Sequence, residues 1–188
     1  MHGVVTIPNA VSLVRLLLIP LFIWLVLIEQ TAWAGVLLGF IGATDWVDGY
    51  LARRLDQVSE VGKMLDPIAD RLAVAVAVIL GLIVGVLPAW FAWAIIIREV
   101  VIGIGSVYGW MNGVRRLDVR WLGKAATFLL YFAVTGFYVA DGLDLRWMWW
   151  GSVALGFPGL VAYYVVAFAY LGDMRRAVAG TEPSESDQ

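Results

Sequence analysis

The chain has 188 residues, of which 62% are hydrophobic, and its formal net charge at pH 7 is −2. Soluble domains are usually about 45–50% apolar, so this composition indicates an integral membrane protein, and the length is that of one domain. The nearly balanced charge gives no sign of a nucleic-acid partner. The absence of cysteine excludes disulfides, thiolate metal sites and thiol catalysis.

The apolar residues fall into six runs of roughly 20 residues, the length at which a helix crosses the hydrocarbon core of a bilayer. The runs cover residues 7–28, 31–53, 62–86, 89–111, 121–140 and 147–171, with short polar or proline-containing segments between them. We therefore expect an all-α integral membrane protein with six transmembrane helices over residues 1–172. Residues 173–188 are mostly polar, which predicts a disordered tail.

Basic residues are distributed unevenly about the predicted spans. Nine lie on one side, namely Arg53, Arg54, Lys63, Arg115, Arg116, Arg120, Lys124, Arg175 and Arg176, and on the other side there is Arg146. Because cytoplasmic loops are enriched in Lys and Arg, we expect a plasma-membrane protein with both termini in the cytoplasm. The clustered Trp147, Trp149 and Trp150 are then expected in an aromatic belt at the outer interface.

Four aspartates flank the predicted loop between the second and third spans. Asp45 and Asp48 are separated by three residues, and Asp66 and Asp70 by four, so each pair lies on one face of its helix. The short loop makes the two spans antiparallel, which places all four carboxylates at a similar depth near the cytoplasm. Each carboxylate inside a membrane costs roughly 2.5–3.5 kcal/mol, so intramembrane carboxylates indicate a functional site.

Divalent cations would relieve the mutual repulsion of these four carboxylates. A ligand set made of oxygen alone suits Mg²⁺, Mn²⁺ or Ca²⁺, and two ions bridged by carboxylates are typical of phosphoryl-transfer sites. Gly49, Ala52 and Gly62 remove side-chain bulk where a nucleotide could approach, and Arg53 is a cation suited to phosphate.

Two other interpretations of the acidic stretch are open. The aspartates could pair structurally with Arg53, Arg54, Lys63 and Arg71. They could also form the filter of a divalent-cation channel or transporter. Their position near one side of the predicted membrane, with no polar path continuing to the other, favours an enzyme.

Residues 45–70 resemble the signature of the CDP-alcohol phosphatidyltransferase family, Asp-x2-Asp-Gly-x2-Ala-Arg-x8-Gly-x3-Asp-x3-Asp. The six-span layout is also similar to that family. The resemblance implies a cytoplasm-facing polar cavity in which a CDP-linked lipid is attacked at its lipid-side phosphorus and CMP is released.

The same resemblance implies roles for individual residues. Two Mg²⁺ or Mn²⁺ ions and the pyrophosphate would be held by Asp45, Asp48 and Asp66. The metal-adjacent Asp70 would be the general base that takes the proton of the acceptor hydroxyl. The cytidine pocket would be lined by Gly49, Ala52 and Gly62, with Arg53 supporting the phosphates.

The flanking sequence is similar to the branch of phosphatidylglycerophosphate and cardiolipin synthases. The features that carry this likeness are the opening Ile7-Pro8-Asn9, the pair Arg98-Glu99 in the fourth span and Gly123-Lys124 at the start of the fifth. The likeness implies CDP-diacylglycerol as donor and a glycerol-type lipid or glycerophosphate as acceptor, with membrane lipids as further partners.

Two positions favour phosphatidylglycerol over glycerol 3-phosphate as the acceptor. Members that use glycerol 3-phosphate typically carry a further Arg where this chain has Gly105-Ser106-Val107, and a second Lys at the position of Ala126. A desolvated dianionic phosphate needs such cations. Glycerol 3-phosphate stays the alternative, because loop cations could supply the charge; the expected acceptor pocket contains Arg15, Arg98, Lys124, Arg115 and Arg116.

Two further features leave alternatives open. Arg15, inside the first span, either faces the acidic region or extends to the cytoplasmic interface. Small residues at Gly103, Gly105 and Gly109 favour close helix packing, either in a homodimer or within one copy.

Overall fold

The structure, a computed structural model, describes the backbone of residues 7–55, 60–112 and 121–179. Side chains are described for residues 14–43, 71–112, 121–176 and 178. Over this part the chain forms helices and no strands. The helices are α1 (Ile7–Leu27), α2 (Thr31–Leu55), α3 (Glu60–Ile83), α4 (Ala89–Met111), α5 (Trp121–Gly142) and α6 (Arg146–Ala179).

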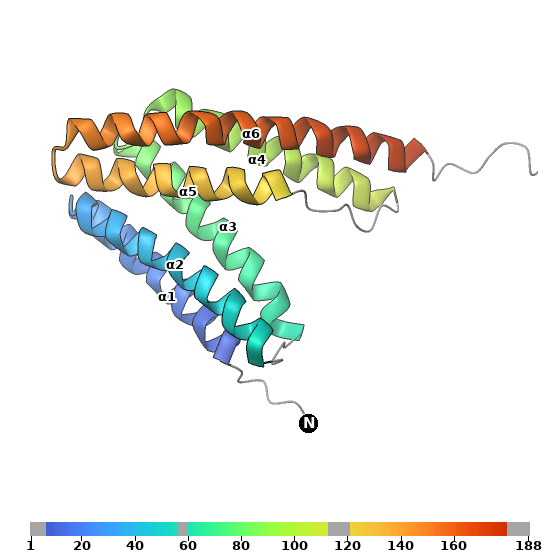
Figure 1. Ribbon diagram of the computed structural model, residues 1–188, viewed down its shortest axis with the longest axis horizontal. Coiled ribbons are helices and arrows are strands. Elements are labelled where there is room, and N and C mark those ends of the chain that lie inside the picture. Colours follow the sequence, from blue (N-terminus) through green and yellow to red (C-terminus); the bar gives the residue numbers. More distant parts are fainter. Residues whose placement is uncertain (1–6, 56–59, 113–120, 180–188) are drawn as a thin grey trace, which may run out of the picture.

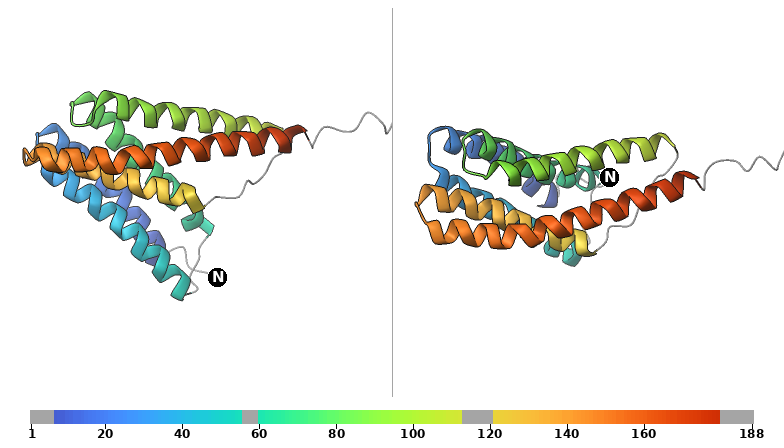
Figure 2. Two further views of the ribbon diagram at one scale, coloured as in Figure 1. Left: turned by 45° about the horizontal axis from the view of Figure 1, so that its top comes forward. Right: turned by 90° about the horizontal axis from the view of Figure 1, so that it is seen from above.

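Successive helices alternate in direction, so the chain runs back and forth between two ends (Figures 1 and 2). The turns α1–α2, α3–α4 and α5–α6 all lie toward the left in Figure 1, and the start of α1 and the end of α6 lie toward the right. Helix α6 packs on α4 and α5, α2 packs on α5, and α1 packs on α2 and α3. As a result α1, α2 and the first half of α3 slope away from the layer of α4, α5 and α6.

Three helical segments are long and apolar enough to cross a membrane, namely α4, α5 and Arg146–Arg176 of α6. In α1, α2 and α3 the apolar segments with described side chains are shorter: Val14–Leu27, Thr31–Ala43 and Arg71–Ile83. The all-helical prediction is confirmed over the described residues. The six-span topology stays a prediction.

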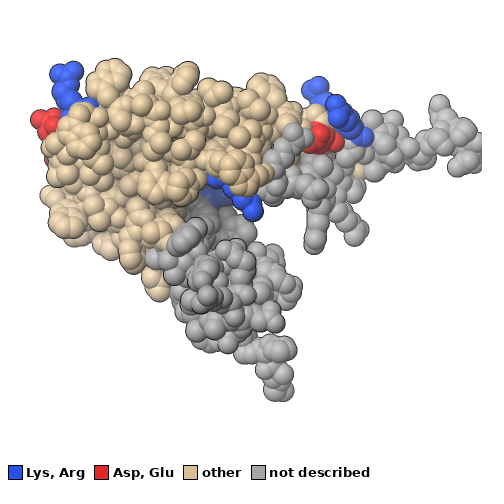
Figure 3. All heavy atoms as spheres, viewed as in Figure 1, with Lys and Arg blue, Asp and Glu red and all other residues tan. Residues whose placement is uncertain are grey.

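The outward surfaces of these helices are strongly apolar. Ile104 on α4, Phe128 on α5 and Phe168 on α6 are 66%, 60% and 71% exposed. Charged side chains in Figure 3 gather mainly at the two ends of the long helices, with a wide uncharged surface between them. Water-soluble proteins rarely expose so much continuous apolar surface, so these faces fit contact with lipid.

The tryptophan cluster at the start of α6 divides into two environments. Trp147 and Trp150 are largely exposed, as a membrane-interface belt requires. The ring of Trp149, in contrast, packs edge-on against Phe137 of α5, with 5.7 Å between ring centroids. Trp149 therefore belongs partly to the packing of α5 on α6.

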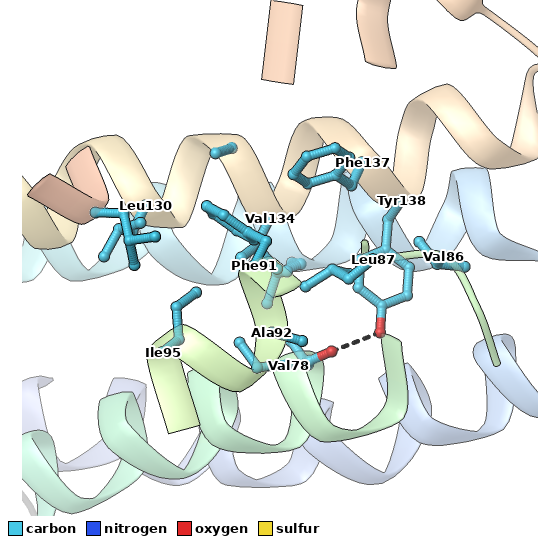
Figure 4. Packing of buried hydrophobic residues seen from close by; sticks show 14 of the residues in the cluster. Val78, Val86, Leu87, Phe91, Ala92, Ile95, Leu130, Val134, Phe137 and Tyr138 are labelled. Carbon is cyan, nitrogen blue, oxygen red and sulfur yellow. Dashed lines mark hydrogen bonds between the residues drawn. The ribbon is translucent and has the colours of Figure 1, made fainter. Parts of the chain in front are cut away.

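The buried core contains residues of all the helices from α1 to α6, and Figure 4 shows the part of it around α3, α4 and α5. Phe91 and Phe137 are fully buried, and their ring centroids are 5.4 Å apart. The buried hydroxyl of Tyr138 donates a 2.7 Å hydrogen bond to the carbonyl oxygen of Ala77, which fixes α5 to α3. Buried tyrosine hydroxyls need such partners, so these bonds set the relative position of the helices.

Helix α6 is longer than the sequence indicated. The sequence predicts a span that ends at residue 171 and a tail over residues 173–188, but the helix continues to Ala179. The reason is a contact with α4: Met174 is 4% exposed, and it fills the space beside Gly105 and Gly109. Gly105 and Gly109 therefore pack within one copy of the chain. The alternative, packing in a homodimer, stays a prediction.

A glycine at the end of α5 permits a close approach to α2, and its replacement should be costly. A Cβ atom added at Gly142 would lie 2.2 Å from the backbone nitrogen of Ala32, whereas one added at Gly103 would meet nothing within 4 Å. We expect Gly142→Ala to lower the free energy of unfolding by about 1–3 kcal/mol, the usual cost of overpacking. Gly103→Ala should be neutral in the same thermal melts in detergent, and equal melting temperatures for the two variants would contradict this packing.

Candidate functional site

The backbone brings the two pairs of aspartate positions to one end of the molecule. Asp45 and Asp48 lie on α2 near its end, and Asp66 and Asp70 lie on α3 near its start. The two helices are in contact, and these ends lie together at the lower right of Figure 1. The antiparallel arrangement expected from the short loop is therefore present.

The side chains of residues 44–70 lie outside the described residues. This range includes the four aspartates and the positions expected to bind phosphate and nucleotide, which are Gly49, Ala52, Arg53 and Gly62. Their roles stay predictions. The structure places all of them on the ends of α2 and α3.

A small apolar cluster fixes the register of α1, α2 and α3. Ile19 of α1, Ile41 of α2 and Ala73 of α3 are each at most 5% exposed, and they form one buried cluster. Since α2 runs opposite to α1 and α3, a step toward the acidic end means going back along α1 and α3 and forward along α2.

One such step, of a single helical turn, reaches positions 15, 45 and 70. Residues three or four apart share a helix face, so Arg15, Asp45 and Asp70 occupy positions on the same packed faces as the apolar cluster. The side chain of Arg15 is only 2% exposed. This burial favours the alternative in which Arg15 faces the acidic region, because it places a cation at the level of the acidic positions; the role of Arg15 stays a prediction.

A second group of polar side chains lies between α4 and α6. The Nη1 atom of Arg98 lies 2.8 Å from the Oε1 atom of Glu99, and the Tyr163 hydroxyl donates a hydrogen bond to that same oxygen. The guanidinium carbon of Arg98 lies 3.7 Å from the centroid of the Tyr163 ring. The side chain of Arg98 is 12% exposed and that of Glu99 is 39% exposed.

Helix α4, which carries Arg98 and Glu99, also packs on α3. The pair Arg98-Glu99, which the sequence singled out, is thus brought toward the helix that carries the predicted base. Tyr163 was not foreseen, because it lies 64 residues from Glu99.

The other expected acceptor residues have different environments. Lys124, in the first turn of α5, is exposed. Arg115 and Arg116 lie outside the described residues. The Ser106 and Tyr170 hydroxyls are 3.1 Å apart and hydrogen-bonded, and Ala126 is fully buried in the core.

No group of three metal-binding side chains occurs among the side chains that the structure describes. The four expected ligands are all carboxylates, on helix ends that lie together. Such a donor set fits hard divalent cations such as Mg²⁺ and Mn²⁺, and it offers nothing to soft metals. Metal binding stays a prediction that this arrangement permits.

Comparison with known proteins places the chain among its relatives. The sequence pattern of the CDP-alcohol phosphatidyltransferase family matches residues 5–171. The chain belongs to this family. Its acidic stretch on α2 and α3 is therefore that of a CDP-alcohol phosphatidyltransferase, and the resemblance first noted over residues 45–70 extends over nearly all the described helices.

The names of individual relatives point to two different activities. A protein of Mycobacterium tuberculosis named "Putative cardiolipin synthase" is 41% identical over 129 residues, which make up 68% of this chain and 61% of that protein. A "Cardiolipin synthase (CMP-forming)" of Streptomyces coelicolor is 36% identical over 93% of this chain and 85% of that protein. A "CDP-diacylglycerol--glycerol-3-phosphate 3-phosphatidyltransferase" of Escherichia coli is 29% identical over 97% of this chain and 98% of that protein.

These names agree on the family and differ in the acceptor. The positions expected to distinguish the acceptors, Ser106 and Ala126, lie on α4 and α5. The acidic pattern on α2 and α3 is the one expected for the whole family, so it does not favour either acceptor.

Proposed function

We propose that this protein transfers the phosphatidyl group of CDP-diacylglycerol to a glycerol-type acceptor and releases CMP, with phosphatidylglycerol as the favoured acceptor and cardiolipin as the product. Family membership over residues 5–171 supports the reaction class. The observation that carries the choice of acceptor is the burial of Ala126, which is 0% exposed within the apolar core.

The acidic helix ends would perform the chemistry. The carboxylate of Asp70 takes the proton of the acceptor hydroxyl while the acceptor oxygen bonds to the lipid-side phosphorus. The bond from that phosphorus to the bridging oxygen breaks, and CMP leaves with this oxygen. Two divalent cations, when held by Asp45, Asp48, Asp66 and Asp70, offset the charge of the pyrophosphate and the leaving CMP.

The acceptor side of the site contains few uncompensated cations among its described residues. Ala126 contributes no charge, Ser106 is bonded to Tyr170, and Arg98 is paired with Glu99. A phosphate monoester dianion would be desolvated there with too little compensation. Phosphatidylglycerol brings a phosphodiester with a single negative charge and a free hydroxyl, which fits this charge balance.

Glycerol 3-phosphate is the second candidate. The Escherichia coli relative named for that acceptor aligns over 97% of this chain. Lys124 is exposed at the start of α5, and Arg115 and Arg116 precede it in the sequence. These cations could compensate a dianion if they reach the acceptor.

The setting of the reaction follows from the charge distribution. We place the enzyme in the plasma membrane with six spans, with both termini and the acidic site toward the cytoplasm, and with Arg146 toward the outside. A homodimer is compatible with the exposed apolar faces of α4, which include Gly103. Chemical crosslinking of the detergent-solubilised protein would test that assembly.

The acceptor is decided by a direct assay. Purified protein with Mn²⁺ and labelled CDP-diacylglycerol is offered phosphatidylglycerol or glycerol 3-phosphate separately, and both CMP and the lipid product are measured. We expect cardiolipin to form at least about tenfold faster than phosphatidylglycerophosphate. The reason is that the second negative charge of glycerol 3-phosphate would lack a compensating cation in the site.

Two results would contradict the proposal at different levels. Faster transfer to glycerol 3-phosphate would replace the acceptor and leave the reaction class intact. Absence of CMP release with either acceptor, together with Mn²⁺ flux into vesicles that contain the protein, would favour the channel alternative.

A further inference from the structure

The contact between Arg98 and Glu99 is unusual for two consecutive residues of a helix. Neighbouring side chains point about 100° apart around the helix axis, and they do not face each other. The Nη1 and Oε1 atoms nevertheless lie 2.8 Å apart on α4. A group outside α4 must therefore hold the two side chains together.

Tyr163 of α6 is that group. Its hydroxyl donates to the Glu99 oxygen that also accepts from Arg98, and its ring lies against the Arg98 guanidinium at 3.7 Å. Tyr163 is 7% exposed and the Arg98 side chain 12% exposed, so the contact of the ring with the guanidinium is largely shielded, where cation–π interactions are strongest. A single side chain thus fixes both members of the pair.

The clamped pair still has hydrogen-bonding capacity to offer. The Nε atom of Arg98 is buried and has no hydrogen-bond partner within the described part of the chain. A buried donor without an acceptor is costly, so an oxygen of a bound molecule would be favoured there. Helix α4 packs on α3, the helix that carries Asp70, which is proposed to deprotonate the acceptor.

We propose that Tyr163 is a positioning residue that holds the Arg98 guanidinium for the phosphate of the acceptor, and this inference rests on the proposed function. The Tyr163 hydroxyl anchors Glu99, Glu99 occupies one N–H of Arg98, and the ring supports the guanidinium plane. Arg98 then presents its remaining N–H groups in one orientation with its charge partly neutralised. This arrangement suits the single negative charge of a phosphodiester.

The neighbouring residue supplies a matched control. Tyr164 also lies on α6, and its hydroxyl donates a 2.8 Å hydrogen bond to the carbonyl oxygen of Ala94 on α4. Tyr164→Phe therefore removes one hydroxyl bond between the same two helices without touching Arg98 or Glu99. Tyr163→Phe removes the bond to Glu99 and keeps the ring, and Tyr163→Leu removes both contacts.

The experiment measures kcat, the KM for phosphatidylglycerol, the KM for CDP-diacylglycerol and the melting temperature of each variant in detergent. We expect Tyr163→Phe to raise the acceptor KM about tenfold, the factor that corresponds to one lost hydrogen bond to a charged group. Tyr163→Leu should raise it about fivefold further through the lost cation–π contact. The KM for CDP-diacylglycerol should not change, and Tyr164→Phe should alter neither KM.

Glu99→Gln tests the same arrangement from α4, because it weakens the charge-assisted bonds to Arg98 and Tyr163. It should also raise the acceptor KM. If Tyr163→Phe and Tyr164→Phe lower the melting temperature equally and leave the acceptor KM unchanged, the role of Tyr163 is packing alone and the inference is wrong. If the wild-type protein releases no CMP with either acceptor, the proposed function fails first and the inference fails with it.

Discussion

Asp70→Asn is expected to abolish phosphatidyl transfer while leaving the protein folded. An amide has the size of the carboxylate, but it cannot accept the proton of the acceptor hydroxyl at neutral pH. General-base catalysis usually contributes factors of about 10²–10⁴, so we expect CMP release to fall by about a thousandfold. The melting temperature in detergent should change little, because the reduced repulsion among the carboxylates offsets the loss of one of the charges that compensate Arg15.

The structure offers a matched control at the opposite end of the molecule. Asp144 lies in the turn between α5 and α6, where its φ angle of 52° is in the left-handed region that asparagine tolerates well. Asp144→Asn therefore removes a carboxylate without backbone strain, and it should retain wild-type activity. Retention of more than about a tenth of the wild-type rate by Asp70→Asn would exceed what is left without a general base, and Asp70 would lose that role.

Local sequence signals predict a helix end well where that end has a local cause. The turn at Leu87-Pro88 is an example: proline cannot donate a backbone hydrogen bond, and α4 begins directly after it, at Ala89. The end of α6 has no such local cause. The polar residues from position 173 resemble a tail, yet Met174 packs against glycines of α4 that lie 65 and more residues earlier, and this contact extends the helix.

The candidate site also has one part with a local signal in the sequence and one part that depends on long-range packing. The acidic positions follow from spacing within 26 residues, so the pattern alone located them on two adjacent helix ends. The partner of Arg98 and Glu99 depends on how α4 packs on α6, and no spacing reveals that packing. One signal was available: Tyr163, Tyr164 and Tyr170 place three hydroxyls in an apolar helix, where each needs a partner. Each of them bonds to α4.

Replacing the buried arginine of α1 should have the largest effect on stability. Arg15 is 2% exposed, and a buried cation is stable only where opposite charges compensate it. Positions 45 and 70 lie on the faces of α2 and α3 that pack at the same level. Arg15→Met keeps an apolar chain and removes the charge, which should leave the carboxylates without compensation.

We expect Arg15→Met to destabilise the protein by about 3–5 kcal/mol, which corresponds to a fall in melting temperature of roughly 10 °C for a chain of this length. Arg176→Met, in the exposed last turn of α6, carries the same change in side chain and should cost at most about 1 kcal/mol.

Measuring the loss of stability of Arg15→Met with and without metal shows whether Arg15 compensates charge or only fills space. Divalent cations and Arg15 would offset the same carboxylate charge, so the loss on Arg15→Met should be larger in EDTA than in Mn²⁺. A packing role predicts equal losses in the two buffers, because metal binding does not refill the space of a removed side chain. Equal losses, or a melting temperature close to that of Arg176→Met, would show that Arg15 does not compensate the acidic site.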